Sequence, residues 1–351
     1  MDGEIIRKRS RAVRERLKEK KLDCLIVTKP ANVSYMTGFL GDDSWALIGG
    51  RFAYLLTDSR YTEQATKECP HCKIVERKGP MSETAASLMG KLRSVRTAGV
   101  EDSTSVAVFR ALRKNIGMRV RAVAGIVEAV REIKDSSEVA AIRAAGRIAA
   151  EAFEKSRRFI EAGVTENQLA GVLDLEIRKL GASNSFPTIV AFGANGSRPH
   201  HQPGKRRLKR NDCVLIDFGV KHKGYCCDLS RCFEMGRAGA LYKRAYEAVV
   251  KSQLAAIEAI RAGAQIQQVD AAAKRVIAEY SFPIYGHGTG HGLGLEVHEM
   301  PVVAKNRKGK LKAGQVITVE PGVYIPGKLG IRIEDDVLVT ETGCKLLSGN
   351  C

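Results

Sequence analysis

Five stretches decide the fold of this 351-residue chain: VLIDFGV (214–220), YCCDLSR (225–231), GHGTGHGLGLEVHE (286–299), VITVEPGVY (316–324) and IRIEDDVLV (331–339). Each contributes one candidate metal ligand, and these are Asp217, Asp228, His291, Glu320 and Glu334. A charged carboxylate in an apolar strand is costly unless a partner compensates it. Four carboxylates and one imidazole that meet in one place therefore require cations. This oxygen-rich set suits Mn²⁺, Co²⁺, Fe²⁺ or Zn²⁺ rather than a thiolate-bound structural metal.

The spacing of these residues predicts two pairs of strands that bring the carboxylates together. Asp217 and Asp228 are 11 residues apart with two glycines between them, which predicts a hairpin with both carboxylates on one face. Glu320 and Glu334 are 14 residues apart and would come from a second strand pair. His291 lies in a glycine-rich segment, where the backbone and imidazole rings can crowd into a small pocket.

Such a ligand set predicts hydrolytic chemistry. One cation cannot readily use four carboxylates, whereas two divalent cations about 3.5–4 Å apart can share them through bridging carboxylates. Coordination lowers the pKa of water toward neutrality, so the pair would hold a hydroxide that acts as the nucleophile. Nearby histidines and a glutamate can move protons and stabilise an oxyanion.

Taken singly, each candidate residue also has a purely structural explanation. Asp217 could be a turn carboxylate, and Glu320 could mark the end of a strand or helix. His287 is explained equally well as an ordinary loop residue and as a residue that lines the site. The pair His200-His201 is a weak signal by itself. Only the joint order Asp, Asp, His, Glu, Glu in apolar strands indicates a site.

The composition is that of an ordinary globular protein, with 44% apolar and 27% charged residues. There is no run of 18 apolar residues, so we expect no membrane-spanning segment, and the basic N-terminus does not lead into a signal-peptide-like stretch. The nine cysteines are then expected to be reduced thiols in a cytoplasmic protein. Cys69-Pro-His-Cys72 is a single C-x-x-C, which favours a turn over a zinc site.

The net charge of +18 raises the question of a nucleic-acid or membrane partner. The densest basic cluster, 205–210, follows Pro203-Gly204 and is interpreted as a solvated hairpin tip. The chain also lacks aromatic-rich motifs that stack on bases. We therefore expect neither nucleic acid nor a membrane as a partner.

Two domains are expected. Residues 1–132 alternate strands and helices, which is typical of a small α/β layer domain. Ser136 or Ser137 can cap a long helix that opens the second domain, 133–351. That domain is predicted to be α+β, with helix pairs at 137–161 with 165–180 and at 238–261 with 266–279. Its largely antiparallel strands are predicted at 186–192, 212–220, 223–234, 293–297, 315–325 and 330–340. A helix pair followed by strands occurs twice, which hints at a duplicated half.

Over nearly its whole length the chain resembles the pita-bread metallopeptidases, specifically the Xaa-Pro peptidase branch that contains prolidase and aminopeptidase P. NVSYMTGF (32–39) and LTDSRY (56–61) are similar to the N-terminal creatinase-like domain of that branch. The catalytic-domain motifs are DFG (217–219), D-x-S-R (228–231), HGTGHGLGLEVHE (287–299), VEPG (319–322) and GIRIED (330–335). The resemblance implies a C-terminal pita-bread (creatinase/aminopeptidase) catalytic domain and a smaller N-terminal creatinase-like domain.

The resemblance also implies a role for each metal ligand. Asp217 would bind one metal, Asp228 and Glu334 would bridge both, and His291 and Glu320 would complete the second. Glu320 would in addition be a candidate proton shuttle.

Four further residues would act on the substrate. His298 would hydrogen-bond the scissile carbonyl or the tetrahedral intermediate, and His200 would contact the substrate. Arg332 would hold a substrate carboxylate or backbone through its bidentate guanidinium. His287 would line the same pocket.

Three positions near Asp228 depart from the usual pattern of the branch. Ser230 replaces the usual Thr but keeps the hydroxyl. Cys226-Cys227 beside Asp228 is less usual, and it suggests inactivation by oxidation.

The activity that follows is hydrolysis of Xaa-Pro bonds in small peptides with proline in the second position. The compact N-terminal domain favours an Xaa-Pro dipeptidase over an aminopeptidase P that acts on longer peptides. A methionine aminopeptidase is disfavoured by the additional N-terminal domain. A non-catalytic RNA- or protein-binding member of the fold is disfavoured because all five ligands are present. Two divalent ions per subunit, with Mn²⁺ first and Co²⁺, Fe²⁺ or Zn²⁺ as alternatives, and a homodimer are further expectations from the resemblance.

Overall fold

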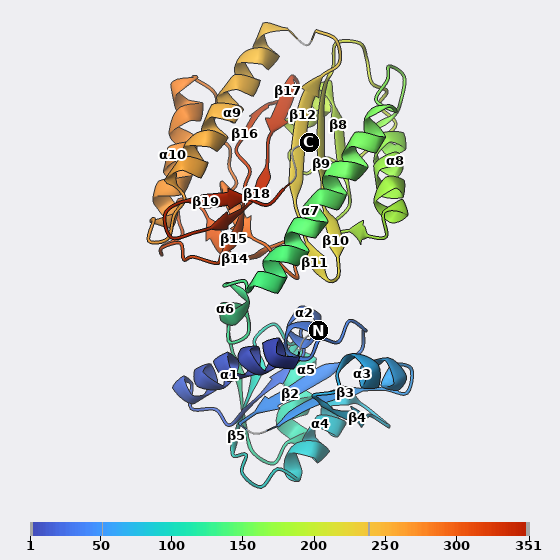
Figure 1. Cartoon of the computed structure of the whole chain (residues 1–351), viewed down its shortest axis with the longest axis vertical. Coiled ribbons are helices and arrows are strands. Elements are labelled where there is room, and N and C mark those ends of the chain that lie inside the picture. Colours follow the sequence, from blue (N-terminus) through green and yellow to red (C-terminus); the bar gives the residue numbers. More distant parts are fainter. Residues whose placement is uncertain (1–2, 51, 238, 349–351) are drawn as a thin grey trace. The chain divides into compact units, whose positions relative to one another are not determined.

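The computed structural model describes residues 3–50, 52–237 and 239–348, which fold into two compact units (Figure 1). The first unit is Met1–Arg131 and the second is Glu132–Cys351. Each has its own hydrophobic core. Among the described residues, no helix combines the length and the apolar character needed to cross a membrane.

Within the described residues, the first unit is an α/β layer on a mixed six-stranded sheet in the order β4-β3-β2-β1-β5-β6. The strands are β1 (Cys24–Val27), β2 (Trp45–Gly49), β3 (Ala53–Thr57), β4 (Lys73–Glu76), β5 (Thr97–Glu101) and β6 (Arg119–Val123). The helices are α1 (Gly3–Glu19), α2 (Pro30–Thr37), α3 (Thr62–Glu68), α4 (Met81–Gly90), α5 (Val106–Asn115) and α6 (Glu128–Arg131). Strand β1 is apolar and fully buried because it lies between antiparallel β2 and parallel β5. The expected α/β domain is therefore confirmed.

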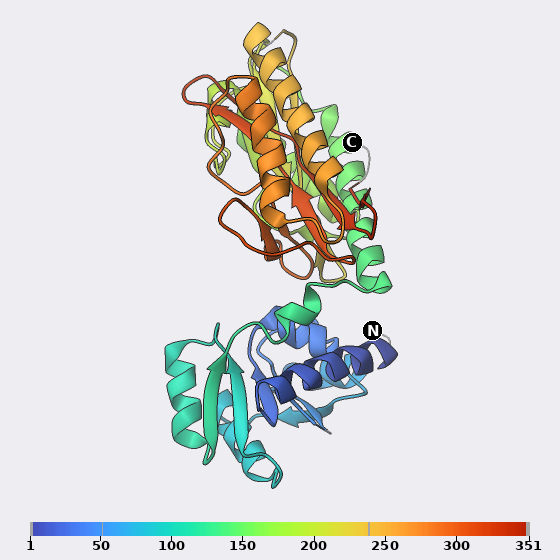
Figure 2. The same ribbon diagram turned by 90° about the vertical axis from the view of Figure 1, so that its left-hand side faces the viewer.

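The second unit carries the helices α7 (Ser136–Arg157), α8 (Glu166–Lys179), α9 (Ala240–Ala259) and α10 (Ile266–Glu279). Helices α9 and α10 pack side by side, as Figure 2 shows. Helix α7 begins at a capping box: the Asp135 carboxylate accepts from the backbone of Ser137 and Glu138, and the Glu138 carboxylate accepts from the backbone of Asp135. The prediction that Ser136 or Ser137 caps this helix is wrong, because Asp135, one residue earlier, supplies a charged acceptor.

The strands of this unit pair antiparallel in the orders β12-β9-β8, β11-β10-β7, β14-β13-β15-β18-β19 and β16-β17. The strands before α9 are β7 (Ser183–Asn184), β8 (Ile189–Phe192), β9 (Cys213–Phe218), β10 (Val220–His222), β11 (Tyr225–Cys226) and β12 (Leu229–Glu234). Those after α10 are β13 (Gly290–Gly292), β14 (Glu299–Val303), β15 (Val316–Val319), β16 (Gly322–Ile325), β17 (Leu329–Arg332), β18 (Asp335–Val339) and β19 (Cys344–Leu346). The expected α+β architecture is confirmed.

Three strands that the sequence predicts as continuous are interrupted at a carboxylate. Asp228 lies between β11 and β12, Glu320 lies between β15 and β16, and Glu334 lies between β17 and β18. Pro321 follows Glu320 and has no N–H with which to continue a ladder. Each carboxylate thus sits where the chain passes from one sheet to another.

The two halves of this unit repeat the same backbone pattern. Gly163 and Gly263 both have positive φ, of 97° and 85°, and precede α8 and α10. The Gly163 N–H donates to Leu208, and the Gly263 N–H donates to Leu311 in the same way. Turns closed by Asp212 N–H to Lys209 and by Gln315 N–H to Lys312 then lead into β9 and β15. This correspondence supports the duplicated half, and it places Asp217 and Glu320 at equivalent positions.

Candidate metal centre and active site

Strand register brings the carboxylates from the two halves together. Asp217 on β9 lies directly opposite Ser230 on β12. An isolated antiparallel bridge then joins Ser230 to Glu334 of the other half. Glu320 and Glu334 are adjacent because β15 and β18 pair with Val319 opposite Asp335. Asp228 directly precedes β12, and one of its oxygen atoms lies within 4.8 Å of ligand atoms of His291 and Glu334.

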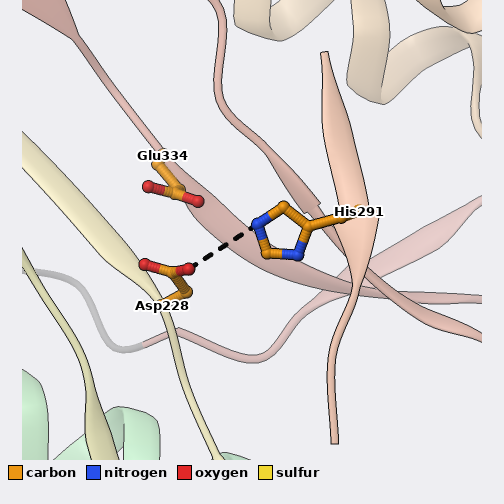
Figure 3. Close-up of side chains that lie close together, drawn as sticks. All are labelled: Asp228, His291 and Glu334. Carbon is orange, nitrogen blue, oxygen red and sulfur yellow. Dashed lines mark ion pairs between the residues drawn. The ribbon is translucent and has the colours of Figure 1, made fainter. Parts of the chain in front are cut away.

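His291 reaches this group from β13. Its Nε2 lies 3.5 Å from Glu320 Oε1 and 3.7 Å from Asp228 Oδ2. One ligand atom each of Asp228, His291 and Glu334 lies within 4.8 Å of the others (Figure 3). Nδ1 of His291 is 3.1 Å from its neighbour's carbonyl at Gly292. A proton on Nδ1 therefore leaves the Nε2 lone pair directed at the carboxylates.

The electrostatics of this group call for cations. Burial raises the pKa of Asp228 and of Glu334 well above the usual value, and the neighbouring carboxylates raise both further. Burial also raises the pKa of Glu320, to about 8. The pKa of His291 is lowered to about 4, first by burial and then by His298. A neutral imidazole among buried, mutually repelling carboxylates is a ligand set that lacks positive charge.

Two unpaired oxygen atoms fit the same conclusion. Oδ1 of Asp217 and Oδ1 of Asp228 are buried, and neither has a hydrogen-bond partner in the described part of the chain. A buried acceptor without a donor is costly, and a divalent cation satisfies it directly. The residues present therefore fit divalent metal ions, because the structure brings ligand atoms of Asp228, His291 and Glu334 together. Metal binding by Asp217 and Glu320 stays a prediction.

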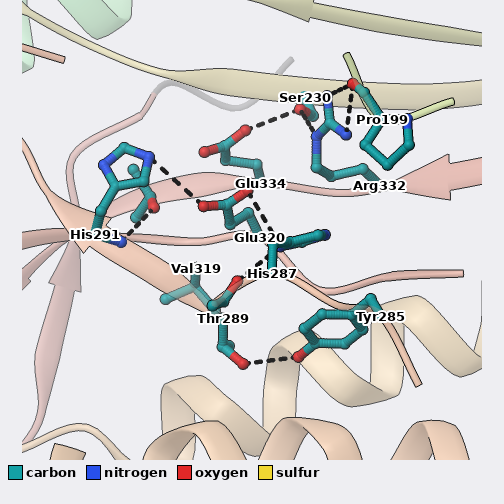
Figure 4. A network of polar contacts seen from close by, with 12 residues as sticks. Pro199, Ser230, Tyr285, His287, Thr289, His291, Val319, Glu320, Arg332 and Glu334 are labelled. Carbon is teal, nitrogen blue, oxygen red and sulfur yellow. Dashed lines mark hydrogen bonds and ion pairs between the residues drawn. The ribbon is translucent and has the colours of Figure 1, made fainter. Parts of the chain in front are cut away.

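Arg332 is tied to the protein by all five of its N–H groups. Nε donates to Ser230 Oγ at 2.9 Å, Nη1 to the Tyr324 hydroxyl at 2.9 Å, and Nη2 to Asp217 Oδ2. Both Nη atoms also lie 3.4 Å from the Pro199 carbonyl oxygen (Figure 4). In this arrangement the buried guanidinium orients Asp217. Its expected contact with a substrate carboxylate stays a prediction.

The remaining candidate histidines are His287, His298 and His200. The His287 imidazole contacts the Tyr324 hydroxyl at 3.1 Å and lies 3.8 Å from Glu320 Oε2. Burial lowers the pKa of His287 to about 4. The exposed ring of His298 lies 4.4 Å from that of His291. His200 is exposed and directly follows Pro199, whose carbonyl reaches Arg332.

Two polar groups of the site were missed by the sequence reasoning. The Tyr324 hydroxyl links His287 to Arg332, although Tyr324 stands inside the VITVEPGVY stretch. Asp336 is fully buried, and its carboxylate accepts the backbone N–H of Asp228 at 3.1 Å. A further carboxylate two residues after Glu334, in the apolar stretch IRIEDDVLV, was the available signal for Asp336.

The cysteines near the site are sheltered. Cys226 and Cys227 are 2% and 0% exposed. Burial raises the pKa of Cys226 to about 12 and that of Cys227 well above the usual value. Because the thiolate is the reactive form, this environment disfavours the oxidation suggested by the sequence.

In the first unit, the Cys72 N–H donates to the Cys69 carbonyl between α3 and β4, which confirms a turn there.

A buried cluster of carboxylates and one imidazole, built from two repeated halves, defines the class of a metal-dependent hydrolase. Residues 140–341 match metallopeptidase family M24, and residues 9–133 match the creatinase/prolidase N-terminal domain. The chain belongs to metallopeptidase family M24.

Relatives of known sequence or structure show which members of the family the chain is similar to. It is 36% identical to an uncharacterized peptidase of Bacillus subtilis, over 93% of this chain and 94% of the relative. A solved Xaa-Pro dipeptidase from Bacillus anthracis has 34% identity and a TM-score of 0.95, covering 99% of this chain and 98% of that one. An X-Pro aminopeptidase from Thermotoga maritima has 33% identity and a TM-score of 0.88, covering 96% and 98%. The predicted fold, metallopeptidase class and Xaa-Pro peptidase branch are thus confirmed.

Proposed function

We propose that this metallopeptidase hydrolyses Xaa-Pro dipeptides at a centre of two divalent metal ions. The supporting observation is the convergence of Asp228, His291 and Glu334 within 4.8 Å. It occurs in a chain that is similar along 99% of its length to an Xaa-Pro dipeptidase.

The proposed ligands divide between the two ions as the resemblance implies. Asp217 would hold one ion, Asp228 and Glu334 would be shared by both, and His291 and Glu320 would hold the other. Unpaired oxygen atoms on Asp217 and Asp228 and the raised pKa of Glu334 support cation binding by these residues. When bound, such ions supply Lewis acidity that polarises a carbonyl and lowers the pKa of water.

The protein side chains would bind the substrate and move protons. Glu320 takes a proton from the attacking water and passes it to the departing proline nitrogen. His298 hydrogen-bonds the scissile carbonyl oxygen as charge develops on it. His200 contacts the substrate, and His287 lines the pocket with Tyr324. Arg332 keeps Asp217 in place. In the expectation from the resemblance it also holds a substrate carboxylate or backbone.

An Xaa-Pro aminopeptidase that accepts longer peptides is the second candidate, because the similarity to the Thermotoga maritima enzyme is nearly as extensive. Rates on Ala-Pro against Ala-Pro-Ala separate the two. Equal kcat/KM on both substrates would overturn the dipeptidase preference. Release of Met from Met-Ala, with none of Ala from Ala-Pro, would instead indicate a methionine aminopeptidase.

The identity of the metal, the oligomeric state, the cellular location and the domain boundary also belong to the proposal. Mn²⁺ is the proposed metal, with Co²⁺, Fe²⁺ and Zn²⁺ as alternatives. A homodimer, a cytoplasmic location and a domain division between residues 132 and 133 also stay predictions.

The test couples metal analysis of the purified protein to an Xaa-Pro assay before and after chelation. We expect about two equivalents of divalent metal per chain, loss of Ala-Pro hydrolysis on chelation, and recovery with Mn²⁺. Activity that survives complete metal removal would contradict the proposal.

A further inference from the structure

The carboxylate of Glu166, in the first turn of α8, forms hydrogen bonds with several residues of one loop of the second unit. Oε1 accepts from the Phe192 N–H at 2.9 Å and from Asn195 Nδ2 at 2.8 Å. Oε2 lies 2.9 Å from His201 Nε2 and accepts from the Gly204 N–H at 3.0 Å. Glu166 is 0% exposed. Four donors spread over 13 positions of sequence, 192–204, therefore converge on one buried side chain.

These contacts keep Glu166 ionised. Burial alone raises the pKa of its carboxyl group, but the hydrogen bonds from His201, Asn195 and the two backbone groups outweigh it, so the pKa lies below the usual value. The N-terminus of α8 adds a favourable partial positive charge. With its Nε2 protonated, the His201 imidazole donates to this carboxylate from a side chain that is only 8% exposed.

The gathered loop leads directly into the active site. It contains the 3-10 helix η1 (Gly193–Ser197) and then Pro199 and His200. The Pro199 carbonyl accepts from Arg332, which in turn binds Asp217.

The loop also docks on β17, the strand that ends at Arg332. A Cβ atom on Gly330 of β17 would overlap the carbonyl oxygen of Gly196. The loop is thus pinned on one side by Glu166 and on the other by β17.

We propose that Glu166 and His201 are positioning residues that hold the 192–204 loop so that His200 reaches the substrate. This proposal rests on the proposed function, because it assigns His200 to substrate binding. Neither positioning residue touches the substrate, and both act through the loop. The competing explanation is that the Glu166 cluster contributes to stability alone.

The substitution Glu166→Gln tests the proposal without changing the shape of the side chain. One carboxylate oxygen faces the Phe192 and Asn195 donors and the other faces the Gly204 N–H and His201. Either orientation of the amide therefore turns its NH₂ group toward at least one backbone N–H and breaks that bond, although His201 can change tautomer and accept. The matched control is Glu176→Gln on the same helix, whose buried carboxylate binds Lys179 at 2.8 Å. Both variants are prepared as the full chain loaded with Mn²⁺.

In kinetics on Ala-Pro, Glu166→Gln should lower kcat/KM by about 10- to 100-fold, as displaced binding groups do. Most of the loss should be a rise in KM. Glu176→Gln should change kcat/KM by less than about twofold. In the His200→Ala background, Glu166→Gln should lower kcat/KM by less than about a further threefold. The reason is that two substitutions that act through the same group do not have additive effects.

His201 offers a conservative rescue. His201→Leu removes the donor to Glu166 and should raise KM like Glu166→Gln. His201→Gln keeps an N–H near the position of Nε2 and should recover most of the affinity.

Hydrogen exchange of the metal-free full chain gives a readout that does not depend on activity. Glu166→Gln should speed amide exchange across 192–204, and Glu176→Gln should not. Unchanged exchange there, or additive effects of Glu166→Gln and His200→Ala, would overturn the proposal. If the wild type fails to hydrolyse any Xaa-Pro substrate, the proposed function falls together with the substrate role of the loop. Exchange then still decides whether Glu166 orders the loop.

Discussion

The Ser230 hydroxyl donates a 2.8 Å hydrogen bond to Oε2 of Glu334, across the junction of the two repeated halves. The same hydroxyl accepts from Nε of Arg332, whose other end holds Asp217. One fully buried oxygen atom thus orients a proposed bridging ligand from one half and, through Arg332, a ligand from the other. Partners of this kind tune a metal site as strongly as some ligands do.

The first prediction therefore concerns Ser230. Ser230→Ala should weaken Mn²⁺ affinity by about 10- to 100-fold, because loss of a hydrogen-bond partner to a ligand has effects of this size. Metal titration by calorimetry measures the change. Ser230→Thr keeps the hydroxyl and is the control, with affinity close to that of the wild type. Equal affinity in the alanine variant would show that Glu334 is oriented without Ser230.

The second prediction concerns the Tyr324 hydroxyl, which joins His287 to Arg332. Tyr324→Phe leaves both without this partner at a partly buried site, and a hydrogen bond to a charged group contributes about 1.5–3 kcal/mol. We expect kcat/KM on Ala-Pro to fall by roughly 10- to 150-fold with unchanged metal content.

The control for this variant is Tyr280→Phe. The Tyr280 hydroxyl binds Lys251 and Glu247 at the surface, so its loss should leave kcat/KM unchanged. Equal kinetics of Tyr324→Phe and the wild type would remove Tyr324 from the site.

The metal ligands could be predicted from the sequence because a carboxylate inside an apolar strand is costly without a partner and therefore indicates a site. Asp217, Asp228 and Glu334 all stand among Val, Ile, Leu or Phe, and the structure buries all three. Glu166 carried no such signal. In the sequence it is an ordinary acidic residue in the first turn of a helix. Its hydrogen-bond partners lie 26 to 38 residues away along the chain. The five contacts of Arg332 were hidden for the same reason, since they depend on tertiary packing.

The glycine-rich segment shows a second limit of sequence patterns. The predicted strand at 293–297 is irregular, and β13 instead spans Gly290–Gly292. A Cβ on Gly290 would overlap the Thr318 carbonyl oxygen, and one on Gly292 would overlap that of Met300. Glycine is needed here for close backbone approach, which alternation of apolar residues does not reveal.

The third prediction concerns stability. Lys134 and Glu299 form an ion pair of 3.2 Å between side chains that are 1% and 6% exposed. Lys134→Met removes one partner of a buried pair, which costs about 3–5 kcal/mol in the free energy of unfolding. Denaturant unfolding measures it. Lys155→Met is the matched control, because its pair with Glu151 is exposed and contributes less than about 1 kcal/mol. Similar losses in the two variants would contradict this reasoning.

The fourth prediction is that Cys226 and Cys227 resist thiol reagents. Both are buried with a raised pKa, so little thiolate forms at neutral pH. Iodoacetamide should leave both unmodified in the native protein and should alkylate both after unfolding, as mass spectrometry would show. Ala-Pro hydrolysis should be retained after the native treatment. Alkylation of either thiol before unfolding would restore oxidation as a mode of inactivation.

The last prediction links metal, pH and stability. Burial and mutual repulsion raise the pKa of Asp228 and Glu334 well above the usual value, and burial raises that of Glu320 to about 8. In the unfolded chain such groups titrate near pH 4, so between about pH 4 and pH 8 these three carboxyl groups bind more protons in the metal-free folded state than in the unfolded state. The lowered pKa of His287 and of His291, to about 4, acts in the opposite direction below about pH 6.5, but two histidines do not cancel three carboxyl groups. Stability of the metal-free protein should then be highest at the acidic end of this window and should fall as the pH rises through it.

Bound cations should reverse that trend, because ligands must lose their protons to bind metal and the ions bind only the folded state. Thermal unfolding from pH 5 to pH 8, in EDTA and in excess Mn²⁺, measures both slopes. We expect the melting temperature in EDTA to decline as the pH rises. The difference between the melting temperatures in Mn²⁺ and in EDTA should widen over the same range. Asp217→Asn should narrow that difference by removing one ligand. Parallel curves in EDTA and Mn²⁺ would mean that these carboxylates do not bind the ions that stabilise the fold.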